Sequence, residues 1–254
     1  MDLKSKAKQL RNAMLLASSH AGRGHLGGAL SCIDILIALY YQNFLNNNNF
    51  ILSKGHSAIA LYTVLRDLEK LGDYSLFDFC QDGSILAEHP CNLIPGVLAT
   101  AGSLGHGLGI ASGMALADKL ANNGRQTYVL VGDGECNEGS IWEAVRFAAE
   151  QELSNLHMII DSNGLRSTDE ANLPGLHFIL VNFGWIVTET DGHDFEKITK
   201  AFKYVPIPPN KRPRAYIMNT VKGKGISFME NDVRWHNGVP SGELLQKALK
   251  EFYE

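Results

Sequence analysis

Two apolar runs separated by one helical segment limit the possible folds of this chain more than any other feature. Residues 127–131 (TYVLV) and 156–160 (LHMII) are dominated by apolar side chains, which is typical of strands covered on both faces. Between them, residues 139–151 place Trp142 and Val145 at helical spacing, ready for packing. A strand, a helix and a second strand predict a right-handed βαβ unit with parallel strands.

The same alternation of segments extends over the rest of the chain. Apolar periodicity predicts helices over residues 3–19, 31–45, 56–71, 110–121, 195–202 and 242–252, with Ser31 as a possible N-cap and a Gly-rich stretch at 20–28 before it. Short β-prone runs predict strands over residues 50–52, 185–190 and 215–220. The pattern favours a single α/β domain over residues 1–254, with a mostly parallel sheet and helices on both faces.

Composition excludes several classes of function. The 254 residues carry a formal net charge of −4, so no electrostatic footprint for nucleic acid is present. No apolar run approaches the ~20 residues that span a bilayer, and the basic N-terminal segment lacks a signal-peptide core. The four cysteines contain no CxxC pair, so neither a zinc site nor a disulfide framework is indicated. We therefore expect a cytoplasmic protein without a membrane or nucleic-acid partner.

Polar loops follow both central strands. Residues 132–134 (GDG) follow the first strand, and residues 161–165 (DSNGL) follow the second. Ligands of open α/β sheets bind outside the carboxyl ends of the strands, where Asp133 and Asn163 should emerge side by side. A carboxylate and an amide oxygen suit Mg²⁺, or alternatively Ca²⁺, completed by phosphate oxygens.

The glycines of the first loop strengthen this interpretation. Gly132 and Gly134 leave the backbone open to a diphosphate, and the helix that starts after Gly139 adds a favourable field. Gly and Asp are also common in plain turns, which is the alternative for the GDG sequence alone. The Asp-x-Asn-Gly loop at the next strand end favours a ligand site over a turn.

This pair of loops resembles the thiamine diphosphate fingerprint, a Gly-Asp-Gly followed about thirty residues later by an Asn pair. The metal-binding Asn of that fingerprint matches Asn163. The resemblance implies Asp133 as the second side-chain ligand of Mg²⁺ and the carbonyl of Leu165 as a backbone ligand.

Further motifs resemble the transketolase family, in the order of the family and over nearly the whole chain. They are residues 24–28 (GHLGG), 52–56 (LSKGH), 88–90 (EHP), 102–107 (GSLGHG) and 235–238 (WHNG). The family has proline where this chain has Leu26 and glycine where it has Glu88. These departures, with residues 165–167 (LRS), favour a specialised substrate.

The resemblance implies roles for particular side chains. His25, His89 and His236 would contact the substrate hydroxyls and the developing alkoxide. The cofactor would be contacted by His56, His106, Gly102, Leu104, Gly132, Asp133, Gly134, Glu138 and Asn163. Glu138 would also help to connect paired sites across a dimer, although a plain charge at a helix N-terminus is an equal alternative. We interpret His157 and His177 as structural, and His193 as a turn residue or a pocket-lining one.

Transketolases carry a second, pyrimidine-binding domain with a glutamate that activates the cofactor, and no such domain is visible here. The resemblance therefore implies a C-terminal transketolase subunit as partner, in an α₂β₂ heterotetramer with cofactor sites at the interface. The implied reaction is transfer of a two-carbon ketol unit between sugar phosphate donors and aldehyde acceptors. The alternatives are the alpha subunit of a 2-oxo acid dehydrogenase and a non-catalytic binding domain with the same fold.

Overall fold

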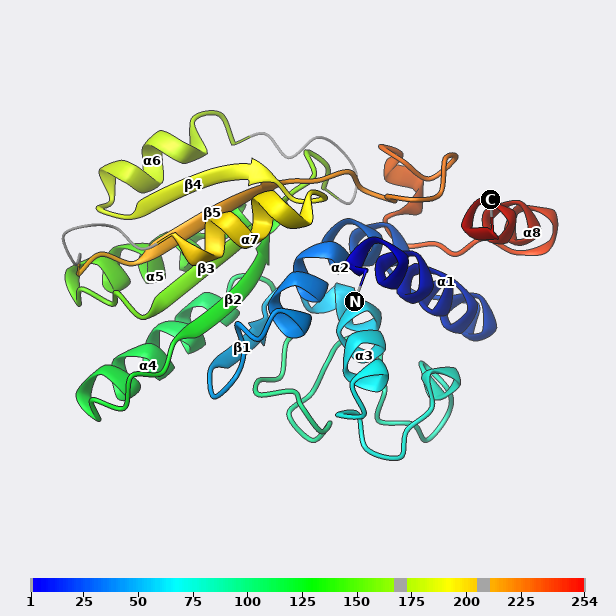
Figure 1. Ribbon diagram of the computed structural model, residues 1–254, viewed down its shortest axis with the longest axis horizontal. Helices are drawn as coiled ribbons and strands as arrows, with labels where there is room; N and C mark the ends of the chain where they lie inside the picture. Colours follow the sequence, from blue (N-terminus) through cyan, green and yellow to red (C-terminus); the bar gives the residue numbers. More distant parts are fainter. Residues whose placement is uncertain (1, 167–172, 205–210, 254) are drawn as a thin grey trace.

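The computed structural model describes residues 2–166, 173–204 and 211–253, and it contains one five-stranded parallel sheet (Figure 1). The strands are β1 (Asn49–Leu52), β2 (Thr127–Gly132), β3 (Leu156–Ser162), β4 (Ile186–Asp191) and β5 (Arg214–Asn219). Their order is β1-β2-β3-β5-β4, and every neighbouring pair is parallel. The predicted α/β class and the five predicted strands are thus confirmed, with β2 and β3 at the centre of the sheet.

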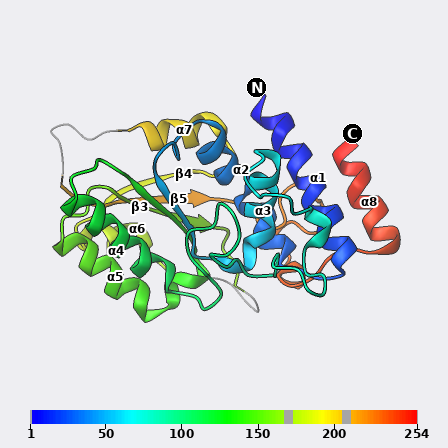
Figure 2. The same cartoon turned by 90° about the horizontal axis from the view of Figure 1, so that it is seen from below.

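Helices cover both faces of this sheet. They are α1 (Leu3–Ala21), α2 (Leu26–Tyr41), α3 (Ala58–Asp67), α4 (Gly107–Leu120), α5 (Gly139–Glu150), α6 (Leu176–Asn182), α7 (Phe195–Lys203) and α8 (Gly242–Tyr253). Figure 2 shows α4, α5 and α6 on one face, and α2 and α7 on the other. Each face has its own apolar core, as the alternating βα pattern requires. Among the described helices, none is both long and apolar enough to cross a membrane.

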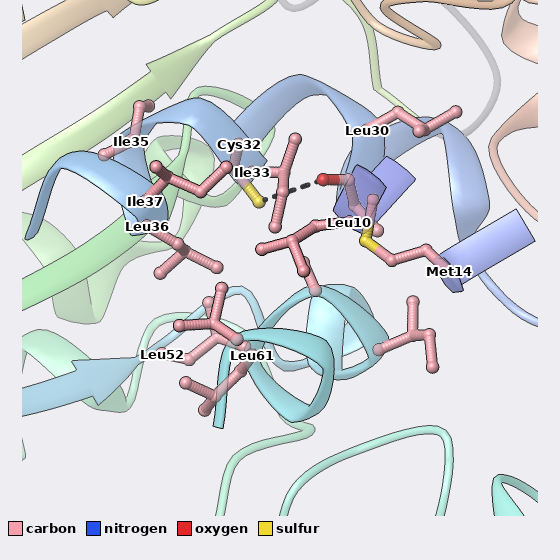
Figure 3. Close-up of a cluster of buried hydrophobic side chains, with 14 of the residues drawn as sticks. Leu10, Met14, Leu30, Cys32, Ile33, Ile35, Leu36, Ile37, Leu52 and Leu61 are labelled. Carbon is pink, nitrogen blue, oxygen red and sulfur yellow. Dashed lines mark hydrogen bonds between the residues drawn. The ribbon is translucent and has the colours of Figure 1, made fainter. Parts of the chain in front are cut away.

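Helix α2 lies at the centre of the larger core. All its residues from Leu26 to Leu39 are buried, because α1 and α3 pack against it on sides that do not face the sheet. Figure 3 shows Leu10 and Met14 of α1, Leu36 of α2 and Leu61 of α3 meeting in this core. A helix that is apolar all round is expected only in such a position.

The predicted start of the second helix was wrong. Helix α2 begins at Leu26 and not at Ser31, so Ser31 is an interior residue whose hydroxyl donates to Asp161 Oδ2 at 2.6 Å. Gly27 and Gly28 of the predicted loop are helical, and a Cβ on Gly27 would lie 2.6 Å from the carbonyl oxygen of Trp235. Only glycine fits at this position of the helix, because the two backbones pack closely. Glycine stabilises a helix less than alanine does, so the close packing lowers the intrinsic stability of the helix.

Helices α3 and α6 also differ from the expectation. The segment predicted as a helix over 56–71 starts with a 3₁₀ turn at Gly55–Ser57 and continues as α3, which ends at Asp67. Helix α6 was not predicted, because its seven residues are too few for a clear amphipathic period.

Candidate functional site

A cavity of about 270 Å³ lies at the carboxyl ends of β2 and β3. The predicted site residues that line it are His56, Leu104, Gly132, Asp133, Gly134, Glu138, Asn163, Leu165 and His236. A larger open groove of about 1440 Å³ runs along the edge strand β4 and α7, and none of the predicted site residues lines it. The chemistry therefore belongs to the smaller cavity.

Asp133 ties the two strand-end loops together. Gly132 pairs with Asp161 in the β2–β3 register, so the residues that follow emerge next to each other. The Asp133 carboxylate accepts the backbone N–H of Gly134 at 2.7 Å and that of Gly164 at 2.6 Å. Burial and the neighbouring Asp161 carboxylate raise the pKa of Asp133 above its ordinary value. A bound cation would offset this concentration of negative charge.

The predicted backbone ligand already has a cationic neighbour. Lys222 Nζ donates to the carbonyl oxygens of Leu165 and Arg166, both at 3.0 Å. Burial lowers the pKa of Lys222 to about 8. Lys222 was not predicted from the sequence, although it follows β5 closely and β5 ends at the same edge of the sheet.

The donor set fits a metal that keeps phosphate ligands. Over the described ranges, no three His, Cys, Asp or Glu side chains gather into a metal-binding cluster. Asp133, the Asn163 amide and the Leu165 carbonyl offer one charge and three oxygens. Mg²⁺ bound together with a diphosphate needs only such a small set of protein ligands.

A buried ion pair supports the floor of the cavity. Lys54 and Asp161 have side chains that are 1% and 0% exposed, and the ammonium donates to the carboxylate. Asp161 also accepts the hydroxyls of Ser31 and Thr220. Although burial acts to raise it, the pKa of Asp161 is lowered, because Lys54 and the two hydroxyls stabilise the charged form. This pair was not predicted. It joins the segment after β1 to strand β3, and to helix α2 as well, because Lys54 also donates to the Gly28 carbonyl at 3.0 Å.

Glu135 holds a third loop in place. Its carboxylate accepts the N–H of Gly105 at 2.9 Å, the N–H of Gly132 at 3.2 Å and the hydroxyl of Ser53. The loop that carries Leu104 is thereby fixed against the end of β2. Glu135 was also missed from the sequence, because a glutamate directly after the GDG loop has the pattern of an exposed turn residue.

Four histidines form a cluster beside the cavity, which we call the histidine cluster: His25, His56, His89 and His236. The ring centroid of His25 lies 5.5 Å from that of His56, 6.0 Å from His89 and 5.2 Å from His236. Burial is the main cause that lowers the pKa of His56 well below its ordinary value, and the charge of Lys54 is the next. For His236, burial and then the charge of Lys222 lower the pKa to about 3. Neutral imidazoles of this kind donate and accept hydrogen bonds and exchange protons.

The structure places the remaining predicted residues less centrally. A Cβ on Gly102 would lie 3.8 Å from His89, so this glycine borders the histidine cluster. His106 is exposed at the start of α4, outside the lining of the cavity, and its role stays a prediction. Glu138 is the exposed N-cap residue of α5, where its side chain makes no capping hydrogen bond.

The other histidines have structural contacts. His157 is buried in β3, within hydrogen-bond distance of the Tyr216 hydroxyl (3.1 Å) and of Gln126 Oε1 (3.0 Å). His177 lies on α6, 3.8 Å from Glu189. His193 Nδ1 is 2.7 Å from Asp34 Oδ2, and its Nε2 accepts the N–H of Val221 at 2.9 Å.

Comparisons with known proteins agree with this geometry. A family model described as "Transketolase, thiamine diphosphate binding domain" matches residues 4–253. The chain is 37% identical to one of the subunits of the apulose-4-phosphate transketolase of Phocaeicola vulgatus, over 100% of this chain and 94% of that one. It is 38% identical to the protein of the same name from Actinobacillus succinogenes, over 98% and 95%.

The fold has a counterpart among solved structures. The transketolase of Campylobacter jejuni superposes with a TM-score of 0.88 at 29% identity, over 99% of this chain and 42% of that one. The chain thus spans about two fifths of that transketolase. These comparisons favour the transketolase hypothesis over the 2-oxo acid dehydrogenase alternative.

Proposed function

The chain belongs to the transketolase family, and on that premise we propose that it is the thiamine diphosphate-binding subunit of a two-chain transketolase. The proposed reaction transfers a two-carbon ketol unit from a sugar phosphate donor to an aldehyde acceptor. The observation that carries the proposal is the cavity that Asp133 and Asn163 line together with His56 and His236 of the histidine cluster, because it combines a place for a metal diphosphate with proton-exchanging groups. The two relatives match over almost their full length, and each is named as one subunit of a transketolase. They support the two-chain form.

Asp133, Asn163 and the Leu165 carbonyl would hold Mg²⁺, with Ca²⁺ as a possible substitute. Gly132 and Gly134 would let the diphosphate approach the backbone. Lys222 donates to the Leu165 carbonyl, and the second lone pair of that oxygen would be left for the metal. The donor set and the raised pKa of Asp133 support the fit.

Once bound, thiamine diphosphate supplies the electron sink for cleavage and formation of the carbon–carbon bond. The protein groups would then orient the substrate and move protons. His25, His89 and His236 would contact the hydroxyl groups of the sugar, as donors or acceptors according to their tautomers. His56, Gly102, Leu104, His106 and Glu138 would contact the cofactor.

A second subunit would supply the pyrimidine-binding domain, and an α₂β₂ heterotetramer is the symmetric assembly that we propose. By their names, the two relatives act on apulose-4-phosphate. We propose a phosphorylated ketose of the same class as donor for this enzyme. The departures at Leu26, Glu88 and Arg166 would adapt the site to that donor.

Calorimetry of the purified chain with thiamine diphosphate tests the site. We expect a binding signal that requires Mg²⁺ and disappears in Asp133→Ala. Glu143→Gln, an exposed change on α5, is the matched control and should bind as the wild type does. A signal that Asp133→Ala leaves unchanged would contradict the proposed metal site.

Ketol transfer tests the reaction. The chain alone should show no transfer from a ketose phosphate, and transfer should appear when it is combined with the partner subunit. Substantial turnover by the rigorously purified chain would contradict the two-chain proposal. Lipoamide-dependent decarboxylation of a 2-oxo acid, without ketol transfer, would favour the alternative enzyme class.

A further inference from the structure

We propose that Glu88 is a positioning residue for His25: its carboxylate binds Nδ1 of the imidazole and leaves Nε2 as the unprotonated nitrogen. The geometric part of this inference stands on contacts in this chain. Its consequence for catalysis rests on the function proposed above.

The contact joins two segments that are far apart in the sequence. Glu88 Oε1 lies 2.9 Å from His25 Nδ1, and the side chains of His25 and Glu88 are 15% and 14% exposed. The other carboxylate oxygen, Oε2, accepts a hydrogen bond from Arg23 at 2.9 Å, and the Arg23 side chain is 62% exposed. Glu88 therefore has one oxygen turned toward solvent and one turned toward the histidine cluster.

Within the part of the chain that the structure describes, no other group competes for these two atoms. Among the described residues, neither His25 Nδ1 nor Glu88 Oε1 has a hydrogen-bond partner with aligned geometry, although both atoms are fully buried. Their separation is a hydrogen-bond distance, while the ring N–H does not point at the oxygen. Aligning the ring N–H with the oxygen takes a rotation about the broad ring torsion of histidine, which costs less than leaving two buried polar atoms unpaired.

The charges around His25 make Glu88 distinctive. The titratable or charged groups that face His25 are Glu88, His56, His89, His236 and Lys222. Burial, His89 and Lys222 lower the pKa of His25, and Glu88 alone among these causes raises it. Glu88 thus stabilises a proton on the one imidazole that touches all three others of the cluster.

The same chain already uses this arrangement in its core. Asp34 lies 2.7 Å from Nδ1 of His193, and Nε2 of His193 accepts the N–H of Val221. The hydrogen bond to Nε2 requires that nitrogen to be unprotonated, so the proton is on Nδ1 and faces the carboxylate. For His25 we propose the same arrangement: the Glu88 carboxylate binds Nδ1, and Nε2 accepts a hydrogen bond from the substrate instead of from a backbone N–H.

The transketolase motif that residues 88–90 resemble has glycine in place of Glu88. A glycine at this position offers His25 no carboxylate. In this chain the tautomer is fixed before substrate binds, and Nε2 is ready to accept a proton or a hydroxyl hydrogen bond. We infer that Glu88 contributes to the choice and handling of the donor.

Nitrogen NMR of the full chain labelled with ¹⁵N-histidine tests the geometry without any turnover. His25 is assigned from the resonance missing in His25→Gln. The wild type should show His25 protonated at Nδ1, and Glu88→Gly should lose this preference, with the pKa of His25 lowered by about one unit. Arg23→Ala is the matched control, because it removes only the exposed contact, and it should retain the wild-type tautomer. An unchanged tautomer and pKa in Glu88→Gly would overturn the proposal.

The complex with the partner subunit tests the consequence. If His25 must be neutral to accept a proton, the acidic limb of the pH profile of kcat/KM follows its pKa. Glu88→Gly should then shift that limb to lower pH and reduce kcat by about tenfold, with smaller changes in KM. Glu88→Gln keeps the shape without the charge and should show the same pH shift with a smaller loss of kcat. A rise in KM with an unmoved pH profile would make Glu88 a mere contact residue and contradict the positioning role.

The two experiments separate this inference from the proposed function. If no form of the protein binds the cofactor in a Mg²⁺-dependent manner but the NMR result is as expected, the proposed function is rejected and the Glu88–His25 pairing stands. Normal ketol transfer in all variants, with an unchanged His25 resonance, would reject the pairing and leave the function intact.

Discussion

The backbone N–H of Gly105 donates to Glu135 Oε1 at 2.9 Å, and this bond fastens the loop before α4 to the loop after β2. Gly105 has a φ of +85°, and a Cβ there would lie 2.3 Å from Ser140 Oγ. The buried Glu135 carboxylate, together with the Ser140 hydroxyl that donates to the Gly105 carbonyl at 3.0 Å, therefore determines where Leu104 lies at the cavity.

Glu135→Ala should leave the N–H groups of Gly105 and Gly132 unpaired in a dry environment. We expect a loss of about 2–3 kcal/mol in the free energy of unfolding, measured by urea denaturation. Cofactor affinity measured by calorimetry should fall as well, because Leu104 loses its support. Glu143→Gln on the exposed face of α5 is the control, and equal stability of the two variants would refute the role of Glu135.

Lys54→Met should be more harmful than the loss of its two hydrogen bonds suggests. The substitution leaves the charge of Asp161 buried with only two hydroxyls and a distant amide, and we expect a loss of about 3–5 kcal/mol. Arg146→Gln breaks the exposed pair with Glu150 and should change stability by less than about 0.5 kcal/mol. Denaturant titration of both variants checks the contrast, and a small effect at Lys54 would argue against the buried pair.

His157 should make the fold sensitive to acid. Burial lowers the pKa of His157 from 6.5 to about 3, so the folded state excludes a proton that the unfolded chain binds. Its contribution to stability is complete above pH 6.5 and is lost as the pH falls toward 3, at about 1.4 kcal/mol per pH unit. His157→Asn should reduce the slope of unfolding free energy between pH 6 and 4 by about that amount. The same slope in both proteins would be inconsistent with the neutral, buried imidazole.

Gly27→Ala and Gly113→Ala should have opposite effects, although both glycines are in helices. A Cβ on Gly27 meets the Trp235 carbonyl oxygen at 2.6 Å, whereas a Cβ on Gly113 meets nothing within 4 Å. We expect the first substitution to destabilise the protein by about 2 kcal/mol or more and to displace His236. The second should stabilise it by about 0.5–1 kcal/mol, because alanine favours the helix. Thermal unfolding of both variants decides the matter, and a tolerated Gly27→Ala would disprove the close packing.

The sequence alone was sufficient for the sheet and for the place of Asp133 and Asn163. Apolar runs reveal buried strands, and parallel strands linked by one helix bring their carboxyl ends to a common edge. Both facts follow from local pattern and topology. The motifs of residues 24–28, 52–56 and 235–238 were visible as well, and the structure brings His25, His56 and His236 together.

Only the tertiary structure decided how those residues are held. Ser31 and Asp161 are 130 positions apart in the chain, and Lys222 reaches Leu165 across 57 positions, so no periodic pattern announces either contact. Position 27 of helix α2 needs glycine because the Trp235 backbone leaves no room for a side chain, and this tertiary constraint outweighs the low helix propensity of glycine. The partners of buried charges are likewise set by three-dimensional proximity, because desolvation makes each buried charge depend on whichever group the fold brings beside it.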